Sequence, residues 1–172
     1  MSHVAAGKTT DVIPLELAQT LSGLFRERVR RSPDAIAYRQ FDPRTRHWED
    51  TRWSEMAESV ARWQAAMLRE GLARGDRVAV MLRNCREWVM FDQAAHGLGL
   101  VVVPLYTDDR PENVAYILQN AGVRLLLIGG DEHWERLAQV RDQLGFLLRI
   151  VSVATIPEAT DARLMPIEIW LP

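Results

Sequence analysis

From residue 78 onwards the chain contains four short and almost uninterrupted apolar runs, beginning near Val78, Val101, Leu125 and Leu148. Their starts are 23, 24 and 23 residues apart. Runs this uniformly apolar are typical of strands that are covered on both faces, as in a parallel sheet. Each interval has room for one crossover helix, so the pattern predicts three successive βαβ units.

The segments between these runs have the spacing of amphipathic helices. Helices are expected over residues 85–98, 112–120 and 132–144. Asn84, with Glu87 three residues later, predicts a capped start for the first helix, and Pro111 suits the first position of the second. Right-handed crossovers would place helices above and below the sheet. We therefore expect an α/β fold with a mostly parallel sheet that is covered by helices on both faces.

The first half of the chain predicts a helix and a β-hairpin ahead of the sheet. From Leu21 the apolar residues follow helical spacing, and Pro33 disfavours helix in the residue before it. The turn-forming sequence DPRT (residues 42–45) separates two strand-like segments. Ser54 is a good N-cap for a second helix, which would run to about Glu70.

The same pattern divides the chain into three parts. Residues 1–13 are mixed in character and are expected to form a flexible tail. Residues 14–153 are expected to form the α/β subdomain. After Val153 the periodicity is lost, so residues 154–166 are interpreted as a loop, and 154–172 as a linker or the start of a further subdomain.

Composition narrows the class of protein. The 172 residues, 48% of them apolar, suit a single domain with a sizeable core. A formal net charge of −2 argues against a general affinity for nucleic acid or anionic membrane. Cys85 is the only cysteine, which excludes an internal disulfide and indicates a reducing, cytoplasmic compartment. No apolar run reaches the roughly 18 residues of a transmembrane helix.

Recognisable catalytic and metal-binding motifs are missing from the sequence. Lys8 is the only lysine, and the partial phosphate-loop match around it (AAGKTT, residues 5–10) lacks the upstream glycine and a preceding strand. The four histidines are not at metal-ligand spacing, and Cys85 has no cysteine partner. We therefore expect no catalytic and no metal-binding residue within this segment.

The loops that follow the strands are the places where an open parallel sheet binds ligands. They are expected at residues 83–84, 106–110 and 129–131. Asn84 and the pair Gly129–Gly130 also have purely structural interpretations, as a helix cap and as a turn.

Three stretches resemble the N-terminal part of the adenylate-forming, AMP-binding enzymes, and among these especially the long-chain acyl-CoA synthetases. They are TRWSEM (51–56), GLARGDRVAVMLRNCREW (71–88) and GLGLVVVPLYTDDRPENVAYILQNAGVRLLLI (97–128). The resemblance covers residues 21–153. Within it, the run PLYT (104–107) leans towards fatty-acyl members of the family.

The resemblance implies an enzyme that activates a carboxylic acid in two steps. ATP, with Mg2+, and a long-chain fatty acid form an acyl-adenylate, and coenzyme A then takes the acyl group. The family's ATP loop, ribose-binding aspartate and catalytic lysine lie downstream of this region. The segment alone is therefore expected to be inactive, with no cofactor bound to it. It would supply scaffold and pocket wall to the rest of the same polypeptide, and its uncovered docking face would permit a homodimer.

The resemblance also indicates where ligands would approach. In some related ligases the nucleotide part of coenzyme A lies near the loop after the third family strand and the helix that follows, which here means residues 106–109 and the region of Arg136. The residues expected to face the substrate or coenzyme A are Asn84, Tyr106, Thr107, Asp108 and Arg136. For Arg136, the alternative is a solvated helix residue without a ligand.

Two other functions remain open from the sequence. One is another acid-activating, adenylating enzyme, such as a fatty-acyl-AMP ligase that passes its acyl group to a carrier protein, or an activator of aryl or amino acids. The other is a self-standing α/β binding module. A Ser/Thr/Gly-rich loop encoded beyond Pro172 would exclude the module, and the identity of the acceptor would separate the two ligases.

Overall fold

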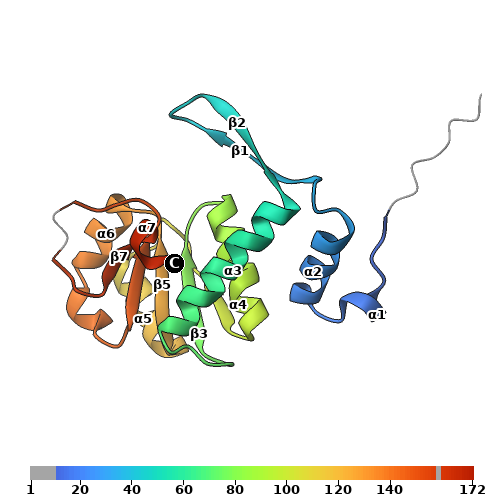
Figure 1. Cartoon of the computed structure of the whole chain (residues 1–172). Helices are drawn as coiled ribbons and strands as arrows, with labels where there is room; N and C mark the ends of the chain where they lie inside the picture. The colour runs from blue at the N-terminus through green and yellow to red at the C-terminus, as the bar shows by residue number, and fades with distance from the viewer. Residues whose placement is uncertain (1–10, 158–159) are drawn as a thin grey trace, which may run out of the picture.

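The centre of the protein is a five-stranded parallel sheet (Figure 1). A computed structural model describes residues 11–157 and 160–172. The strands are β3 (Arg77–Met81), β4 (Val101–Pro104), β5 (Val123–Ile128), β6 (Arg149–Ser152) and β7 (Leu164–Pro166). They lie in the order β4-β3-β5-β6-β7, and every neighbouring pair is parallel. The four apolar runs thus form adjacent strands of one sheet, which confirms the predicted fold class.

Helices cover both faces of this sheet, as predicted. They are α3 (Trp53–Arg69), α4 (Arg86–Leu98), α5 (Pro111–Ala121), α6 (Asp131–Ala138) and a 3-10 helix, η1 (Arg141–Leu144). Side chains alternate along β3, so Val78 and Val80 lie in a core cluster with α3 and α4, and Ala79 and Met81 lie in a second cluster with the other three helices. No helix among the described residues is both long and apolar enough to cross a membrane.

The N-terminal part of the chain lies beside this layered core. Its elements are α1 (Leu15–Ala18), α2 (Leu21–Arg31), β1 (Ile36–Asp42) and β2 (His47–Arg52). The two strands pair antiparallel and project from the domain as a hairpin (Figure 1). α2 lies next to α3 and α4, on the side away from α6 (Figure 1). The predicted first helix and hairpin are therefore confirmed.

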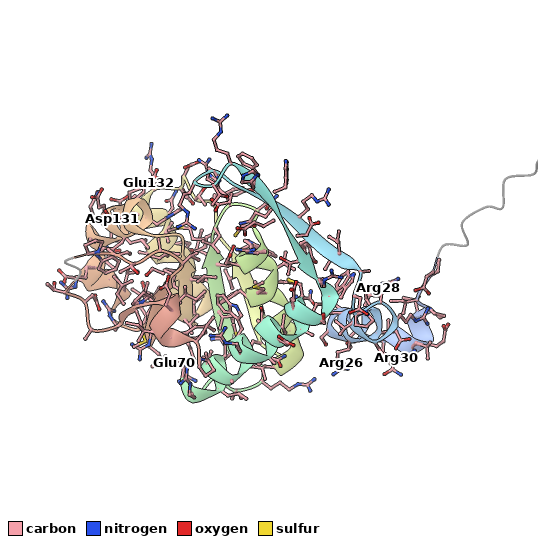
Figure 2. The ribbon with its side chains drawn as sticks, turned by 45° about the horizontal axis from the view of Figure 1, so that its top comes forward. Arg26, Arg28, Arg30, Glu70, Asp131 and Glu132 are labelled. Carbon is pink, nitrogen blue, oxygen red and sulfur yellow. The ribbon has the colours of Figure 1, made fainter. Side chains whose placement is uncertain are left out.

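Basic residues of α2 are paired with the chain that precedes the helix. Arg28 and Arg31 donate to the carboxylate of Asp11 at 2.8 and 2.6 Å. Figure 2 shows the labelled arginines of α2 at the end of the molecule away from the acidic first turn of α6. Of the expected flexible tail, residues 1–10 lie outside the described residues, whereas Asp11 is held to α2.

α3 begins two residues earlier than predicted. Its first residue is Trp53 and its N-cap is Arg52, so the prediction of Ser54 as the N-cap is wrong. The amide N–H of Trp53 donates to the carbonyl oxygen of Ala35 at 3.1 Å, and that of Ser54 donates to the carbonyl oxygen of Pro33 at 3.0 Å. The loop before the hairpin thus satisfies the first two N–H groups of the helix, which allows it to start ahead of Ser54.

α4 is capped by the hairpin instead of by its own neighbouring residues. Its N-cap is Cys85, not Asn84, and makes no side-chain capping bond. The side-chain oxygen of Gln40 on β1 accepts the amide N–H of Arg86 at 2.8 Å, and Glu49 on β2 pairs with the Arg86 guanidinium at 3.0 Å. The predicted Asn84 cap is therefore wrong, because a strand distant in sequence already supplies the acceptor.

The helix predicted over residues 132–144 is divided in two. α6 ends at Ala138 and the 3-10 helix begins at Arg141. Between them, the N–H of Gln139 donates to the carbonyl of Arg136, three residues back, and the next N–H repeats this spacing. The α-helix has tightened into 3-10 turns, whose poorer hydrogen-bond geometry seldom continues for long.

The C-terminal residues add a strand where the pattern predicted a loop over residues 154–166. β7 pairs with β6, with Leu164 beside Ile150. The short helix α7 (Ile167–Trp170) then carries the indole of Trp170 into the core, 5.5 Å from the ring of Trp63. A strand of three residues is too short to show a periodic pattern, so its pairing cannot be read from the local sequence.

Candidate functional site

The strand order reverses between β3 and β5. β4 lies on one side of β3 in the sheet. The next strand along the chain, β5, lies on the other side of β3. Where the order reverses in this way, the loops after the two central strands diverge and leave room for a ligand. Residues 82–84 and 129–130 form these loops, and the loop after β4 lies at the same edge of the sheet.

Arg136 on α6 holds the loop that follows β4. Its Nη1 donates to the carbonyl oxygen of Thr107 at 2.6 Å, and its Nη2 donates to the carbonyl oxygen of Asp109. The carboxylate of Asp109 in turn accepts the N–H of Arg110 at 2.8 Å and the side-chain amide of Asn113 at 3.0 Å. The partly buried guanidinium is thus part of the loop's architecture and is not a freely solvated helix residue.

His133 lies beside this loop and was not among the expected site residues. Its ring packs tightly against Gly129, the residue that follows β5. A Cβ atom on this glycine would lie 2.9 Å from Cε1 of the imidazole. Burial lowers the pKa of the imidazole below its ordinary value of 6.5; Glu132 and Asp108 oppose this shift, and Arg136 adds to it. The ring is therefore uncharged at neutral pH, able both to donate and to accept a hydrogen bond. A lone histidine has no spacing signal, so only the packing of α6 reveals its place.

Asn84 lies in a hollow that is shared with the hairpin. This hollow has a volume of about 470 Å3, and its walls include Phe41, Trp48 and Cys85. Burial raises the pKa of the Cys85 thiol, which keeps it in the unreactive protonated form. The structure therefore places Asn84 with β1 and β2, and it places Thr107 with Arg136.

The remaining expected residues are exposed at the carboxyl edge. Tyr106 is 85% exposed, and Asp108 next to Thr107 is also exposed. Together with Arg83 and His133, they offer a phenol, a carboxylate, a cation and a neutral imidazole. In residues 11–157 and 160–172, no three His, Cys, Asp or Glu side chains gather at one place where they could hold a metal ion. This set of groups suits the binding and orientation of a polar ligand.

The strand order and the helices on both faces define a doubly wound α/β domain, a fold that binds ligands at the carboxyl ends of its strands. A family model described as AMP-binding enzyme matches residues 25–167. Because this match covers most of the chain, the chain belongs to the AMP-binding enzyme family.

Individual relatives agree with this assignment. A long-chain-fatty-acid–CoA ligase of Mycobacterium bovis is 26% identical over 136 residues, which are 78% of this chain and 22% of that protein. The solved fatty acyl CoA synthetase of Mycobacterium tuberculosis matches with a TM-score of 0.67 and 26% identity, over 76% of this chain and 26% of that one. Coronafacic acid ligase from Pectobacterium brasiliense, at 17% identity, shares the fold with a TM-score of 0.77 over 87% of this chain and 29% of that one. This chain therefore spans only 22% of the length of the Mycobacterium bovis ligase.

Proposed function

We propose that this chain is the N-terminal α/β part of an ATP-dependent acid–thiol ligase of the long-chain fatty-acid type. In the complete enzyme, a fatty acid and ATP, with Mg2+, would give an acyl-adenylate and pyrophosphate. The thiol of coenzyme A would then take the acyl group and release AMP. The observation that carries the proposal is the family match over residues 25–167, in a chain whose fold and 26% identity are shared with a fatty acyl CoA synthetase.

In this proposal the segment is scaffold and pocket wall, and its main partner is the rest of the same polypeptide. Its only lysine is Lys8, so the catalytic lysine would come from elsewhere in the complete enzyme. We place the ATP loop and the catalytic lysine in polypeptide that follows Pro172. A cytoplasmic location suits the single Cys85, and a homodimer would form through apolar surface that the missing polypeptide leaves uncovered.

The segment alone is expected to form no acyl-adenylate, and the polypeptide extended through the remainder of its gene is expected to form acyl-CoA. The measurements are ATP–pyrophosphate exchange with oleate, and detection of oleoyl-CoA by mass spectrometry. The control is the extended protein without coenzyme A, which should exchange pyrophosphate but form no thioester. Pyrophosphate exchange above the blank by the segment alone would refute the proposal that this segment lacks the catalytic residues. Acyl transfer to a carrier protein in place of coenzyme A would refute the thiol acceptor.

We also propose that the loop held by Arg136 faces coenzyme A. In the extended enzyme, Arg136→Ala removes both bonds to the loop carbonyls. It is therefore expected to raise the apparent KM for coenzyme A by about tenfold, the loss of two modest hydrogen bonds, while pyrophosphate exchange stays unchanged. Arg110→Ala is the matched control, since it removes an exposed cation from the same loop without touching these bonds. An unchanged KM for coenzyme A in Arg136→Ala would contradict the proposal that this loop faces coenzyme A.

A further inference from the structure

A second hollow lies near the amino ends of β3 and β4, at the opposite end of these strands from the carboxyl edge. We call it the amino-edge hollow. It has a volume of about 470 Å3, within the range of small-molecule sites. The start of α2, the loop before β3 and the end of α4 form its walls. The ionisable residues in these walls are all basic, and no carboxylate of the described residues lines the hollow; they are Arg26, Arg74 and His96.

Arg26 differs from the other arginines of α2 because it has no acidic partner within residues 11–157 and 160–172. The other three form ion pairs with Asp11 or Glu27. Arg26 and Arg28 are two positions apart, about 200° around the helix axis. Figure 2 shows them on opposite sides of α2. The charge of Arg26 is therefore available to a ligand in the amino-edge hollow.

Arg74 brings a second unpaired cation to the amino-edge hollow from the loop before β3. Its side chain packs on Gly99, the C-cap of α4, where a Cβ atom would lie 3.0 Å from Cγ of the arginine. Near this end of α4, the carbonyl oxygens of Ala95 and His96 already accept the N–H groups of Leu100 and Gly99, at 2.9 and 3.1 Å. In the part of the chain that the structure describes, the guanidinium of Arg74 makes no hydrogen bond and no ion pair. Packing on a glycine thus positions this charge without neutralising it.

Thr20 and Ser22 add hydroxyl groups to the same walls. Oγ1 of Thr20 accepts the amide N–H of Gly23 at 2.9 Å and lies 3.2 Å from Oγ of Ser22. One of the two hydroxyl protons serves this contact, which leaves the other as a donor for a ligand. The nearby carboxylate of Asp92 is already engaged, because it lies 3.2 Å from Nε2 of His96.

These groups together favour a phosphate as the ligand. A phosphate ester carries up to two negative charges and three strong acceptor oxygens, which match two guanidinium groups and one hydroxyl donor. A carboxylate has one charge, which a single arginine can neutralise through both of its oxygens. The hollow is also much larger than a bare phosphate ion, so it has room for the molecule that carries the phosphate.

We propose that the amino-edge hollow binds the phosphate group of a small phosphorylated molecule. Arg26 and Arg74 would donate to the phosphate oxygens from two sides, and the hydroxyl pair of Thr20 and Ser22 would supply a further donor. This inference is independent of the proposed ligase activity, because the hollow and the carboxyl-edge loops lie at opposite ends of β3 and β4.

The test uses ribose 5-phosphate and ribose, which differ in the phosphate group alone. Titration of the 15N-labelled protein with ribose 5-phosphate, followed by NMR, should show saturable shifts of the amides of Ser22, Gly97 and Gly99, and ribose should cause none. Inorganic phosphate distinguishes the two sources of the group. Weaker binding of inorganic phosphate than of ribose 5-phosphate would assign the hollow to a phosphate ester, and equal or tighter binding would assign it to the free ion.

Arg26→Gln and Arg74→Gln are each expected to weaken the binding of ribose 5-phosphate about five- to tenfold, the loss of one charge-assisted contact that solvent partly screens. Arg74→Lys retains the charge and should lose less. Arg46→Gln is the matched control, because it removes an exposed arginine from the turn between β1 and β2, and it should bind like the wild type.

The dispersion of the NMR spectrum shows whether each variant is folded. If Arg74→Gln does not fold, the comparison of Arg26→Gln with Arg46→Gln still decides the matter. Absence of saturable shifts at Ser22, Gly97 and Gly99 would overturn the proposal. So would shifts confined to the carboxyl edge, or equal losses of affinity in Arg26→Gln and Arg46→Gln.

Discussion

Replacement of Trp170 by alanine is expected to lower the free energy of unfolding by about 3–5 kcal/mol, the usual cost of truncating a large buried ring. The indole is only 2% exposed and lies 5.5 Å from Trp63. Its Nε1–H donates to the carboxylate of Glu70 at 2.9 Å, and the same carboxylate accepts from Arg149 on β6 at 2.7 Å. Loss of the ring would leave a cavity and a carboxylate with one partner fewer.

The control for this prediction is the neighbouring residue. Ile169→Ala removes an apolar side chain that is 69% exposed, and should change stability by less than about 0.5 kcal/mol. Trp170→Phe retains most of the packing but loses the bond to Glu70, so an intermediate loss is expected. Urea unfolding followed by circular dichroism measures all three variants. Equal, small losses for Trp170→Ala and Ile169→Ala would show that α7 does not belong to the folded core.

Asp161→Asn is expected to lower the free energy of unfolding by about 2–4 kcal/mol. The Asp161 carboxylate is buried and accepts from the guanidinium of Arg163 at 2.7 Å and from that of Arg141 at 3.0 Å. Removal of one member of a buried ion cluster costs about 3–5 kcal/mol, and we reduce this because both arginines are partly exposed to solvent. The cluster joins the loop before β7 to the 3-10 helix, so its loss should loosen the edge of the sheet.

The contribution of Asp161 has a defined pH dependence. Its hydrogen bond with Arg163 holds the pKa of the carboxyl group well below its ordinary value of 3.8. The folded state therefore favours the ionised form, and the stabilisation is fully present above the unfolded pKa and is lost as the pH falls below it. The difference between wild type and Asp161→Asn should be constant from pH 5 to 8 and should shrink below about pH 4. Asp142→Asn, an exposed acid on the 3-10 helix, is the matched control and should not show this effect. A difference that persisted undiminished to pH 2 would contradict the assigned role of the charge.

The central strands could be predicted because a strand that is buried on both faces is apolar at almost every position. Nearly every residue of β3 and β5 is buried, so each strand is a continuous apolar run. The regular spacing of these runs then allowed only crossover helices between them, which led to the layered α/β fold. The turn between β1 and β2 was visible for a similar reason, since Asp42-Pro43 marks it locally.

The starts of two helices could not be predicted, because their caps come from distant residues. Gln40 reaches Arg86 across 46 positions, and carbonyls before the hairpin accept the first N–H groups of α3. Ser54 and Asn84 were the better local candidates for these caps. The tertiary contacts instead satisfy the N–H groups of Trp53 and Ser54 at the start of α3, and that of Arg86 at the start of α4.

The candidate site could likewise be predicted only in part from the sequence. The loops after β3, β4 and β5 were expected at the carboxyl edge, because parallel strands end on the same side of their sheet. The contact of Arg136 with the carbonyl of Thr107, 29 residues away, and the position of His133 depend instead on how α6 packs.

By itself the sequence determined the class of fold and the three helical crossovers that join β3, β4, β5 and β6. It did so because burial on both faces dictates the character of every residue in a strand. Only the tertiary structure decided where two helices begin, that a last short strand joins the sheet, and which polar groups lie together at its carboxyl edge. Each of these depends on a hydrogen bond or contact between residues far apart in the chain. The local sequence around either residue does not indicate its partner.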